Sequence, residues 1–566
     1  MKNKFEIGSG HFKRDRLELP SEMIKLFEVN DDELAVILED EDGRPYAAMI
    51  THDGYLYGHG FNAWYRTHML TSSYNIQLEI VDVPQKRLRI TVSPVENRQS
   101  EGLYLGLQWN MVGGVKTELG NSFYLPKSDL LTHAFICGAT GSGKTIFAKA
   151  LLEEALINNI PCIVIDFKGD LSSMKLIIDN DKPDILLPWV EGETVKEQSA
   201  RAVSEMEEHI ERLRSSGLDL NKARQFKEKA KIRIFTPRRA RGIQIAFPAA
   251  LGAPPDALDL AQRNAQEFNE LVGAVTDAFI DRLYPRTLRS KIENERNFVF
   301  EIVKYSWRFE IDLSGIEGLK RLLHMIEKPP FEIIGGLPVS QYVDAENRRS
   351  RLLNKVNTLV SGPETQWFEG QPLSMALLRN CEDKIPLSII NLSELEQFED
   401  RSFVVAQVAH TIYNWMRTQT GTSQPRLLLF IDEIGGGGGK QALFPSYPNE
   451  CAAKWGLNYL LRQGRAFGVC CAFATQNPGD IDYRALSNCG TLAIGRLGTA
   501  LDRSKVLEGM QVVGRDQKWI NNFLIGATPG DFVIRDPKGQ VEYIHSRWTL
   551  SYHKVIAPPE LVRLTK

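Results

Sequence analysis

The stretch GATGSGKT contains the residues whose types and spacing point most clearly to chemistry. It fits the pattern G-x-x-x-x-G-K-[ST], in which glycines let the backbone curl and aim its N–H groups at phosphate oxygens. In this pattern Lys144 supplies a positive charge for the β- and γ-phosphates, and Thr145 supplies a hydroxyl for Mg²⁺. We therefore predict binding of ATP with Mg²⁺ by Gly138, Ala139, Thr140, Gly141, Ser142, Gly143, Lys144 and Thr145.

The segments on either side of this loop support the interpretation. Residues 134–137 are apolar and predict a buried strand, and apolar residues recur at helical spacing after Lys144. A helix that begins directly after the loop adds a partial positive charge at the phosphates. A chance glycine-rich turn would need neither flank, so the context favours a nucleotide site.

A second chemical element is LLLFIDE, residues 427–433, which predicts a buried strand that ends in two acids. Asp432 would hold Mg²⁺ through water, and Glu433 would polarise a water for attack on the γ-phosphate. An acidic pair at a strand end also suits a solvated turn or a helix cap. Together with the phosphate loop, the pair favours nucleotide hydrolysis over phosphoryl transfer to a metabolite.

Further polar residues follow this strand. Gln476 ends the next apolar run, where an amide can report the γ-phosphate, although strand-to-turn boundaries often carry such residues. The chain has one phosphate loop and one acidic strand, so it cannot complete its site from a second domain of its own. We expect a neighbouring subunit to supply an arginine, in a closed ring. The candidates are Arg462, Arg465 and Arg496.

With these motifs the chain resembles the HerA/FtsK group of ring-forming P-loop ATPases, and within it the HerA-like helicases and translocases. The resemblance spans most of residues 118–545 and is most specific in HAFICGATGSGKT and ATQNPGDID. It implies a hexamer that couples ATP hydrolysis to translocation or unwinding of double-stranded DNA. It also implies roles for the matched residues Lys144, Thr145, Asp432, Glu433 and Gln476, and a place in the nucleotide site for Asp166.

One segment departs from the group, which often continues the acidic pair with Ala-His. Here Glu433 is followed by Ile434 and by five glycines, Gly435 to Gly439. Glycines leave the backbone path unrestrained, which predicts a mobile loop. Such a loop would order on DNA or on a neighbouring subunit, or it would simply be a tolerated surface loop.

The order of predicted elements gives an α/β fold. Alternating strands and helices imply a mostly parallel sheet covered on both faces. Hairpin signals predict a β-rich barrel or sandwich before it, and the resemblance implies a RecA-like core, an N-terminal β-barrel and a helical insert. We predict a β-rich domain at 1–125, the first part of the ATPase core at 126–250, a helical insertion at 251–380, the second part of the core at 381–545 and a C-terminal tail at 546–566.

Composition restricts the partners. The chain of 566 residues has a formal net charge of -3, so contacts with nucleic acid must be local rather than the result of a general basic field. Basic residues cluster at 222–241 and 346–355, where they would line a channel or, as the interleaved polar residues suggest, cover solvated helix faces. The 7 cysteines form no C-x-x-C pair, and no apolar stretch suits a membrane helix. We therefore expect a cytoplasmic protein.

The resemblance also bears on partners. Members of the group commonly act beside a nuclease or another effector, and some belong to bacterial anti-phage systems with sirtuin-like partners. The main hypothesis is a DNA motor paired with such an effector. The alternative is a nucleotide-gated scaffold ring that activates an effector with little translocation; in both, the N-terminal domain would be the docking surface. A membrane-bound conjugation ATPase is disfavoured because no membrane segment is predicted.

Overall fold

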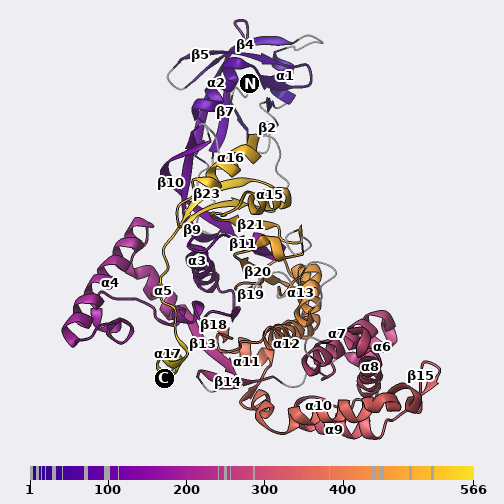
Figure 1. The fold of residues 1–566 in the computed structure, drawn as a ribbon. Coiled ribbons are helices and arrows are strands. Elements are labelled where there is room, and N and C mark those ends of the chain that lie inside the picture. The colour runs from indigo at the N-terminus through magenta and orange to yellow at the C-terminus, as the bar shows by residue number, and fades with distance from the viewer. Residues whose placement is uncertain are drawn as a thin grey trace.

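Two β-sheets form the frame of the chain, a larger one at its centre and a smaller one at the N-terminal end (Figure 1). The computed structural model describes residues 4–7, 12–13, 16–19, 21–27, 33–40, 43–68, 74–94, 102–112, 114–239, 241–247, 251–254, 256–284, 287, 289–381, 383–435, 442–445, 451–482, 487–510 and 515–565. Within these residues, no helix is both apolar enough and long enough to cross a membrane.

The larger sheet is 13-stranded, in the order β10-β9-β23-β22-β21-β11-β20-β19-β12-β18-β13-β14-β17. Neighbouring strands are parallel from β21 to β17 and antiparallel from β21 to β10, which confirms the predicted mostly parallel sheet. The strands are β9 Gly102–Val112, β10 Val115–Pro126, β11 Ala134–Cys137, β12 Cys162–Asp166, β13 Ala230–Pro237, β14 Ile243–Ala246, β17 Gln371–Pro372, β18 Ile385–Asn391, β19 Leu427–Ile431, β20 Val469–Thr475, β21 Thr491–Ile494, β22 Asp531–Arg535 and β23 Val541–Ser546.

Both faces of this sheet are covered, because alternate residues of each strand point to opposite sides. In β11, Phe135 and Cys137 join one hydrophobic core, while Ala134 and Ile136 join the other. The first core packs against α12 Phe398–Arg417 and α13 Ala452–Gln463. The second packs against α3 Lys144–Ile157, α4 Val195–Ser215 and α5 Leu220–Lys229. Runs that are apolar at every position therefore become central strands.

The smaller sheet has its own hydrophobic core and the linear order β1-β7-β8-β4-β5-β6-β3-β2, so its described part is an open, curled half-barrel. The predicted hairpins, whose Asp-Gly signals lie at 42–43 and 53–54 of the sequence, are present: β4 pairs with β5 and β5 with β6, both antiparallel. Strands 102–126 pair within the larger sheet, so the smaller sheet ends at Pro94 and not near the predicted boundary at 125. Its elements are β1 Lys4–Ile7, β2 Phe12–Lys13, β3 Arg16–Glu18, α1 Ser21–Leu26, β4 Leu34–Glu39, β5 Pro45–Ile50, β6 Tyr55–Tyr57, α2 His59–His68, β7 Tyr74–Asp82 and β8 Arg87–Pro94.

A helical insertion lies between β14 and β18, as predicted. The helical stretch 257–283 is interrupted at Asn264, whose side chain caps the second helix by accepting a hydrogen bond from the Glu267 N–H at 3.2 Å. Tyr413 of α12 donates to Glu267 at 2.9 Å and so ties the insertion to the core. The elements are α6 Ala257–Arg263, α7 Ala265–Leu283, α8 Glu293–Arg308, α9 Gly315–Glu327, β15 Ile333–Ile334, β16 Leu337–Pro338, α10 Arg348–Val360 and α11 Met375–Arg379.

The C-terminal residues pack closely against the core. After α15 Ala500–Gly509, α16 Arg515–Ile525 and β23, the chain runs along α3 to α17 Pro558–Thr565 (Figure 1). Arg547 is fully buried and its Nη1 lies 2.8 Å from Glu153 Oε2 on α3. Glu153 also accepts the Leu550 and Ser551 N–H groups. The predicted tail therefore packs as a strap across the helix that follows the phosphate loop.

We expect Glu542→Gln to stabilise the chain at neutral pH. Glu542 is 8% exposed, and burial raises its pKa from 4.5 to about 8 although Gln108 donates to it at 3.0 Å. Because the pKa of Glu542 is higher in the folded chain than in the unfolded chain, ionisation of Glu542 disfavours folding. This cost is absent below pH 4.5 and grows until the pH reaches about 8. The gain in unfolding free energy should therefore rise with pH, to roughly 1–3 kcal/mol at pH 7. Melting curves of both proteins at acidic, neutral and mildly basic pH test this; an equal melting temperature at pH 8 would contradict it.

Candidate nucleotide site

The phosphate loop joins β11 to α3 and has the geometry of an anion cradle. Gly141 and Gly143 have φ angles of +73° and +90°, which L side chains rarely adopt. A Cβ at Gly143 would lie 2.6 Å from the Gly530 nitrogen, so a larger residue would clash there. In the described part of the chain, no group accepts a hydrogen bond from the Gly141 or Gly143 N–H. These two amides therefore fit phosphate oxygens.

Lys144 begins α3 and folds back over this loop. Its Nζ lies 3.5 Å from the Gly138 carbonyl oxygen, and the residue is 7% exposed. Burial lowers the pKa of Lys144, while the nearby charges of Glu433 and Asp432 oppose that effect. A phosphate would supply the negative charge that this buried ammonium group lacks.

Asp432 follows directly after β19 and is 5% exposed. Burial raises its pKa to about 7, and the charge of Asp166 adds to the effect. A divalent cation would offset this cost by stabilising the ionised carboxylate. The carboxylate of Asp432 and the hydroxyl of Thr145 are hard oxygen donors, the kind that Mg²⁺ takes beside nucleotide phosphates. The residues present therefore fit Mg²⁺.

The side chain of Glu433, two residues after β19, forms hydrogen bonds with residues that follow the neighbouring strands β12 and β20. Its Oε2 accepts a hydrogen bond from Lys168 Nζ at 2.9 Å, and its Oε1 accepts the Gln476 N–H at 2.9 Å. Its φ of +55° is unusual for a residue other than glycine and aims the side chain back across the strand ends. Gln476 in turn accepts a hydrogen bond from the Thr140 hydroxyl at 2.8 Å. The structure thus brings the phosphate loop, Glu433 and Gln476 into one hydrogen-bonded group.

Asp166 ends β12, and its carboxylate is fully buried. It accepts the N–H groups of Gly169 at 2.8 Å and of Leu171 and Ser172 at 3.1 Å each. Burial raises its pKa to about 6, although these hydrogen bonds favour the ionised form. Asp166 therefore shapes the loop that follows β12, and its direct contact with a nucleotide stays a prediction.

The candidate arginines lie at opposite ends of the parallel strands: Arg496 at the carboxyl ends, and Arg462 and Arg465 at the amino ends. Arg496 follows β21, its carbonyl accepts the Ala139 N–H at 2.7 Å, and its Nη2 lies 3.8 Å from where a Cβ on Gly141 would be. Arg465 is exposed and precedes β20, so it lies at the edge where the parallel strands begin. The seven residues of β20 span roughly 20 Å. Arg462, also exposed, lies in the last turn of α13 at the same distant edge.

Two residues of this region were missed from the sequence. His133 is buried beside β11, accepts the Cys471 N–H on Nδ1 at 3.1 Å and contacts the Leu461 carbonyl oxygen through Nε2 at 2.9 Å. It fastens the end of α13 to the sheet, close to Arg465, and burial lowers its pKa to about 4. The second missed residue is Lys168, which donates to Glu433. Its signal is a cation placed two residues after an acid that ends a strand.

The glycine run lies largely outside the described residues, so its predicted mobility stays a prediction for Gly436 to Gly439. Gly435 is described, and a Cβ there would lie 2.5 Å from Thr475 Oγ1. The first glycine of the run is therefore required by packing against β20.

The two basic clusters make many local ion pairs. In the first, Lys227 pairs with Asp179 at 2.9 Å and Arg239 with Glu394 at 3.3 Å. In the second, Arg349 pairs with Asp344 at 2.5 Å. Because these basic side chains already pair with nearby acids, the two clusters fit solvent-exposed surfaces better than the lining of a DNA channel.

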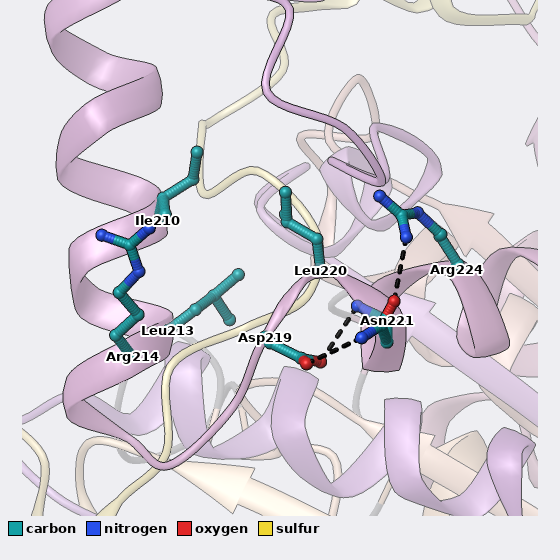
Figure 2. Close-up of a pocket in the computed structure, with 7 residues that line it drawn as sticks. All are labelled: Ile210, Leu213, Arg214, Asp219, Leu220, Asn221 and Arg224. Carbon is teal, nitrogen blue, oxygen red and sulfur yellow. Dashed lines mark hydrogen bonds between the residues drawn. The ribbon is translucent and has the colours of Figure 1, made fainter.

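A cavity of about 280 Å³ lies between the end of α4 and the start of α5 (Figure 2). Its lining includes Leu213, Arg214, Asp219, Leu220 and Arg224, and none of the residues of the nucleotide site. Asp219 caps α5 by accepting the Asn221 and Lys222 N–H groups at 3.0 and 3.2 Å. The cavity is thus separate from the proposed chemistry.

Comparison with known families decides the relationship. Residues 112–412, more than half of the chain, match the family model described as Helicase HerA, central domain. This chain belongs to the HerA helicase central-domain family. The matched region of this HerA-family chain runs from the end of β9 into α12 and includes the phosphate loop, Asp166 and the helical insertion.

Solved structures that resemble the HerA-family chain include those of VirB4 and TrwB. VirB4 of Thermoanaerobacter pseudethanolicus is 12% identical, with 79% of this chain and 97% of that chain covered at a TM-score of 0.48. The plasmid coupling protein TrwB in complex with the ATP analogue ADPNP is 12% identical, with 82% and 98% covered at a TM-score of 0.44. The form of TrwB with ADP and Mg²⁺ is 12% identical, with 81% and 97% covered at 0.40. No curated protein sequence gave a match.

Proposed function

We propose that this HerA-family chain is an ATP-hydrolysing motor that moves along or unwinds double-stranded DNA as a ring. The observation that supports it best is the meeting of the phosphate loop, Asp432, Glu433 and Gln476 at the carboxyl edge of one parallel sheet. In open α/β sheets this edge is where ligands bind. Membership of the HerA central-domain family supports the assignment of the motor class.

Each residue of the site has a distinct task in this proposal. The amides of Gly141 and Gly143 bind phosphate oxygens, and Lys144 neutralises the terminal phosphates. Thr145 and Asp432 would hold Mg²⁺, and the bound ion would offset charge on the phosphate oxygens. Glu433 orients a water and accepts its proton. Gln476 links the terminal phosphate region to Glu433 through its side chain and its backbone N–H.

The ring is proposed because one arginine lies far from the site of its own chain. Arg465 is exposed at the amino edge of the sheet, whereas the phosphate loop lies at the carboxyl edge. Repetition of one contact that places this edge against the next subunit's nucleotide site would form a closed ring, with six subunits as the expected number. Arg465 would then stabilise the transferring phosphate of the neighbouring site.

We also propose that the smaller sheet docks an effector protein, such as a nuclease or a sirtuin-like enzyme of an anti-phage system. Its separate hydrophobic core, residues 17–90, supports an independent folding unit. The long strands β9 and β10 belong to the larger sheet, so a deletion that tests docking should remove residues 1–94 and keep 102–126. Loss of effector binding with retained ATP binding is the expected result.

DNA should stimulate ATP turnover, and salt should reverse the stimulation. The net charge of -3 gives no general attraction to DNA, so binding must use local Lys and Arg contacts that release counterions. We expect turnover to rise severalfold with duplex DNA of any sequence and to fall back between about 50 and 200 mM salt. The measurement is the ATPase rate with and without DNA, on material sized by light scattering. Turnover that ignores DNA and responds only to an effector would favour the scaffold ring.

A further inference from the structure

Lys168 is a cation at the nucleotide site that the proposed chemistry does not use. Its ammonium group donates to Glu433 Oε2 at 2.9 Å, and its side chain is 41% exposed while that of Glu433 is 10% exposed. The pair therefore joins a half-exposed lysine to the carboxylate that must act on water. Its position raises the question of what the lysine does to that carboxylate.

The backbone that carries Lys168 is held in place from several sides. The buried carboxylate of Asp166 accepts the Lys168 N–H at 3.3 Å and the Gly169 N–H at 2.8 Å. Gly169 approaches the C-terminal strap so closely that a Cβ there would lie 2.9 Å from the Ile556 carbonyl oxygen. Ser172 accepts a hydrogen bond from Asn391 at 2.8 Å. Motion at this point is thus confined to the flexible four-carbon side chain of Lys168.

The carboxylate of Glu433 is engaged on both oxygens. Besides Lys168, it accepts the Gln476 N–H at 2.9 Å and lies 3.4 Å from the Thr475 hydroxyl. The Gln476 and Thr475 donors are fixed by the end of β20, within the sheet. Lys168 is the partner on a mobile side chain, and half-exposed ion pairs are weak. It is therefore the donor that can leave when the carboxylate must receive a water.

We propose that Lys168 is a positioning residue that latches Glu433 in a resting state until a nucleoside triphosphate draws the lysine away. The negative phosphates compete with the carboxylate for the ammonium group. Once released, Oε2 of Glu433 is open to the attacking water, while Gln476 still holds Oε1 in place. The latch rests on the proposed ATPase function and adds a control on when that function operates.

The test compares Lys168→Met, which keeps the length of the side chain and removes its charge, with Lys168→Arg, which keeps the charge. The phosphates compete with the carboxylate for Lys168, so the latch of the ATP-bound wild type stays closed for part of the time. Without DNA, we therefore expect Lys168→Met to raise kcat about threefold or more, a modest factor because only a weak pair is lost. KM and the Kd of a fluorescent non-hydrolysable ATP analogue should stay within about twofold. Lys168→Arg, which can still pair with Glu433, should stay near wild type. Lys175→Met, the same change at the end of the same loop, serves as the matched control.

A fall in kcat for Lys168→Met at unchanged KM would overturn the latch, because the lysine would then assist the reaction. An unchanged rate in Lys168→Met would also overturn it and would leave the ATPase proposal standing. If wild type itself shows no turnover, the proposed function fails and the latch fails with it. The wild-type rate therefore separates the two failures.

Discussion

Glu433→Gln should bind ATP normally and lose at least about 100-fold in turnover, because an amide cannot accept the proton of the attacking water. Gln is nearly isosteric with Glu, and its carbonyl oxygen can still accept the Gln476 N–H that Glu433 accepts at 2.9 Å. The backbone there, with φ +55°, is held by the Ile434 N–H, which donates to the Ala474 carbonyl oxygen at 2.8 Å. The site should therefore keep its shape. Steady-state kinetics and the Kd of a labelled ATP analogue measure the two effects.

Two variants control this experiment. Glu542→Gln makes the same chemical change at another buried carboxyl, in β23, and should leave turnover unchanged. Lys144→Ala should instead weaken nucleotide binding, by about tenfold or more, since a charge is lost at the phosphates. Near-normal turnover by Glu433→Gln would remove Glu433 as the base.

Arg465→Ala should lower kcat by at least about 100-fold and change nucleotide affinity little, because an arginine finger acts on the transition state. Arg465 lies at the amino edge of the sheet, away from its own phosphate loop, so in the proposed ring it would act on the site of the next subunit. Arg496→Ala should also lower kcat, but by acting in its own site, where its carbonyl accepts the Ala139 N–H at 2.7 Å. The two losses look alike in pure samples and differ in mixtures.

Mixing with Lys144→Ala subunits separates the two arginines. In an equal mixture with Arg465→Ala, about a quarter of the interfaces would pair an intact phosphate loop with an intact Arg465, so activity should return. In a mixture with Arg496→Ala no site is complete, because Lys144 and Arg496 belong to the same subunit's site, and activity should stay low. Recovery in the Arg496 mixture but not in the Arg465 mixture would reverse the roles. Full activity in a monomer would refute the shared site.

The sequence carries clearer signals for the candidate residues of the site than for the contacts between them. Gly138 to Thr145 and the strand before Asp432 carry local signals, since each depends on neighbours along the chain. The Lys168–Glu433 pair joins residues 265 positions apart, and no local pattern predicts which lysine will reach a distant carboxylate. The opposite placement of Arg465 and Arg496 likewise depends on which strand end each follows in the assembled sheet.

For the fold, too, local features could be predicted from the sequence and contacts between distant segments could not. Apolar runs and Asp-Gly turns predicted the strands and hairpins, and the alternation of elements predicted the parallel sheet. Two features needed tertiary information. Strands 102–126 have ordinary strand patterns, which do not reveal that they pair with β23 rather than with the smaller sheet. The C-terminal strap depends on the buried Arg547–Glu153 pair, whose partners are far apart in sequence.

Displacement of a protein roadblock from duplex DNA tests the central proposal most directly. The DNA carries biotin bound by streptavidin, and the chain is added with ATP, with a non-hydrolysable analogue, or as Glu433→Gln with ATP. A motor should release streptavidin only as wild type with ATP, at a rate that follows the ATPase rate. Release that is equal with the analogue, or no release despite DNA-stimulated ATP turnover, would contradict the proposal that this chain moves along DNA.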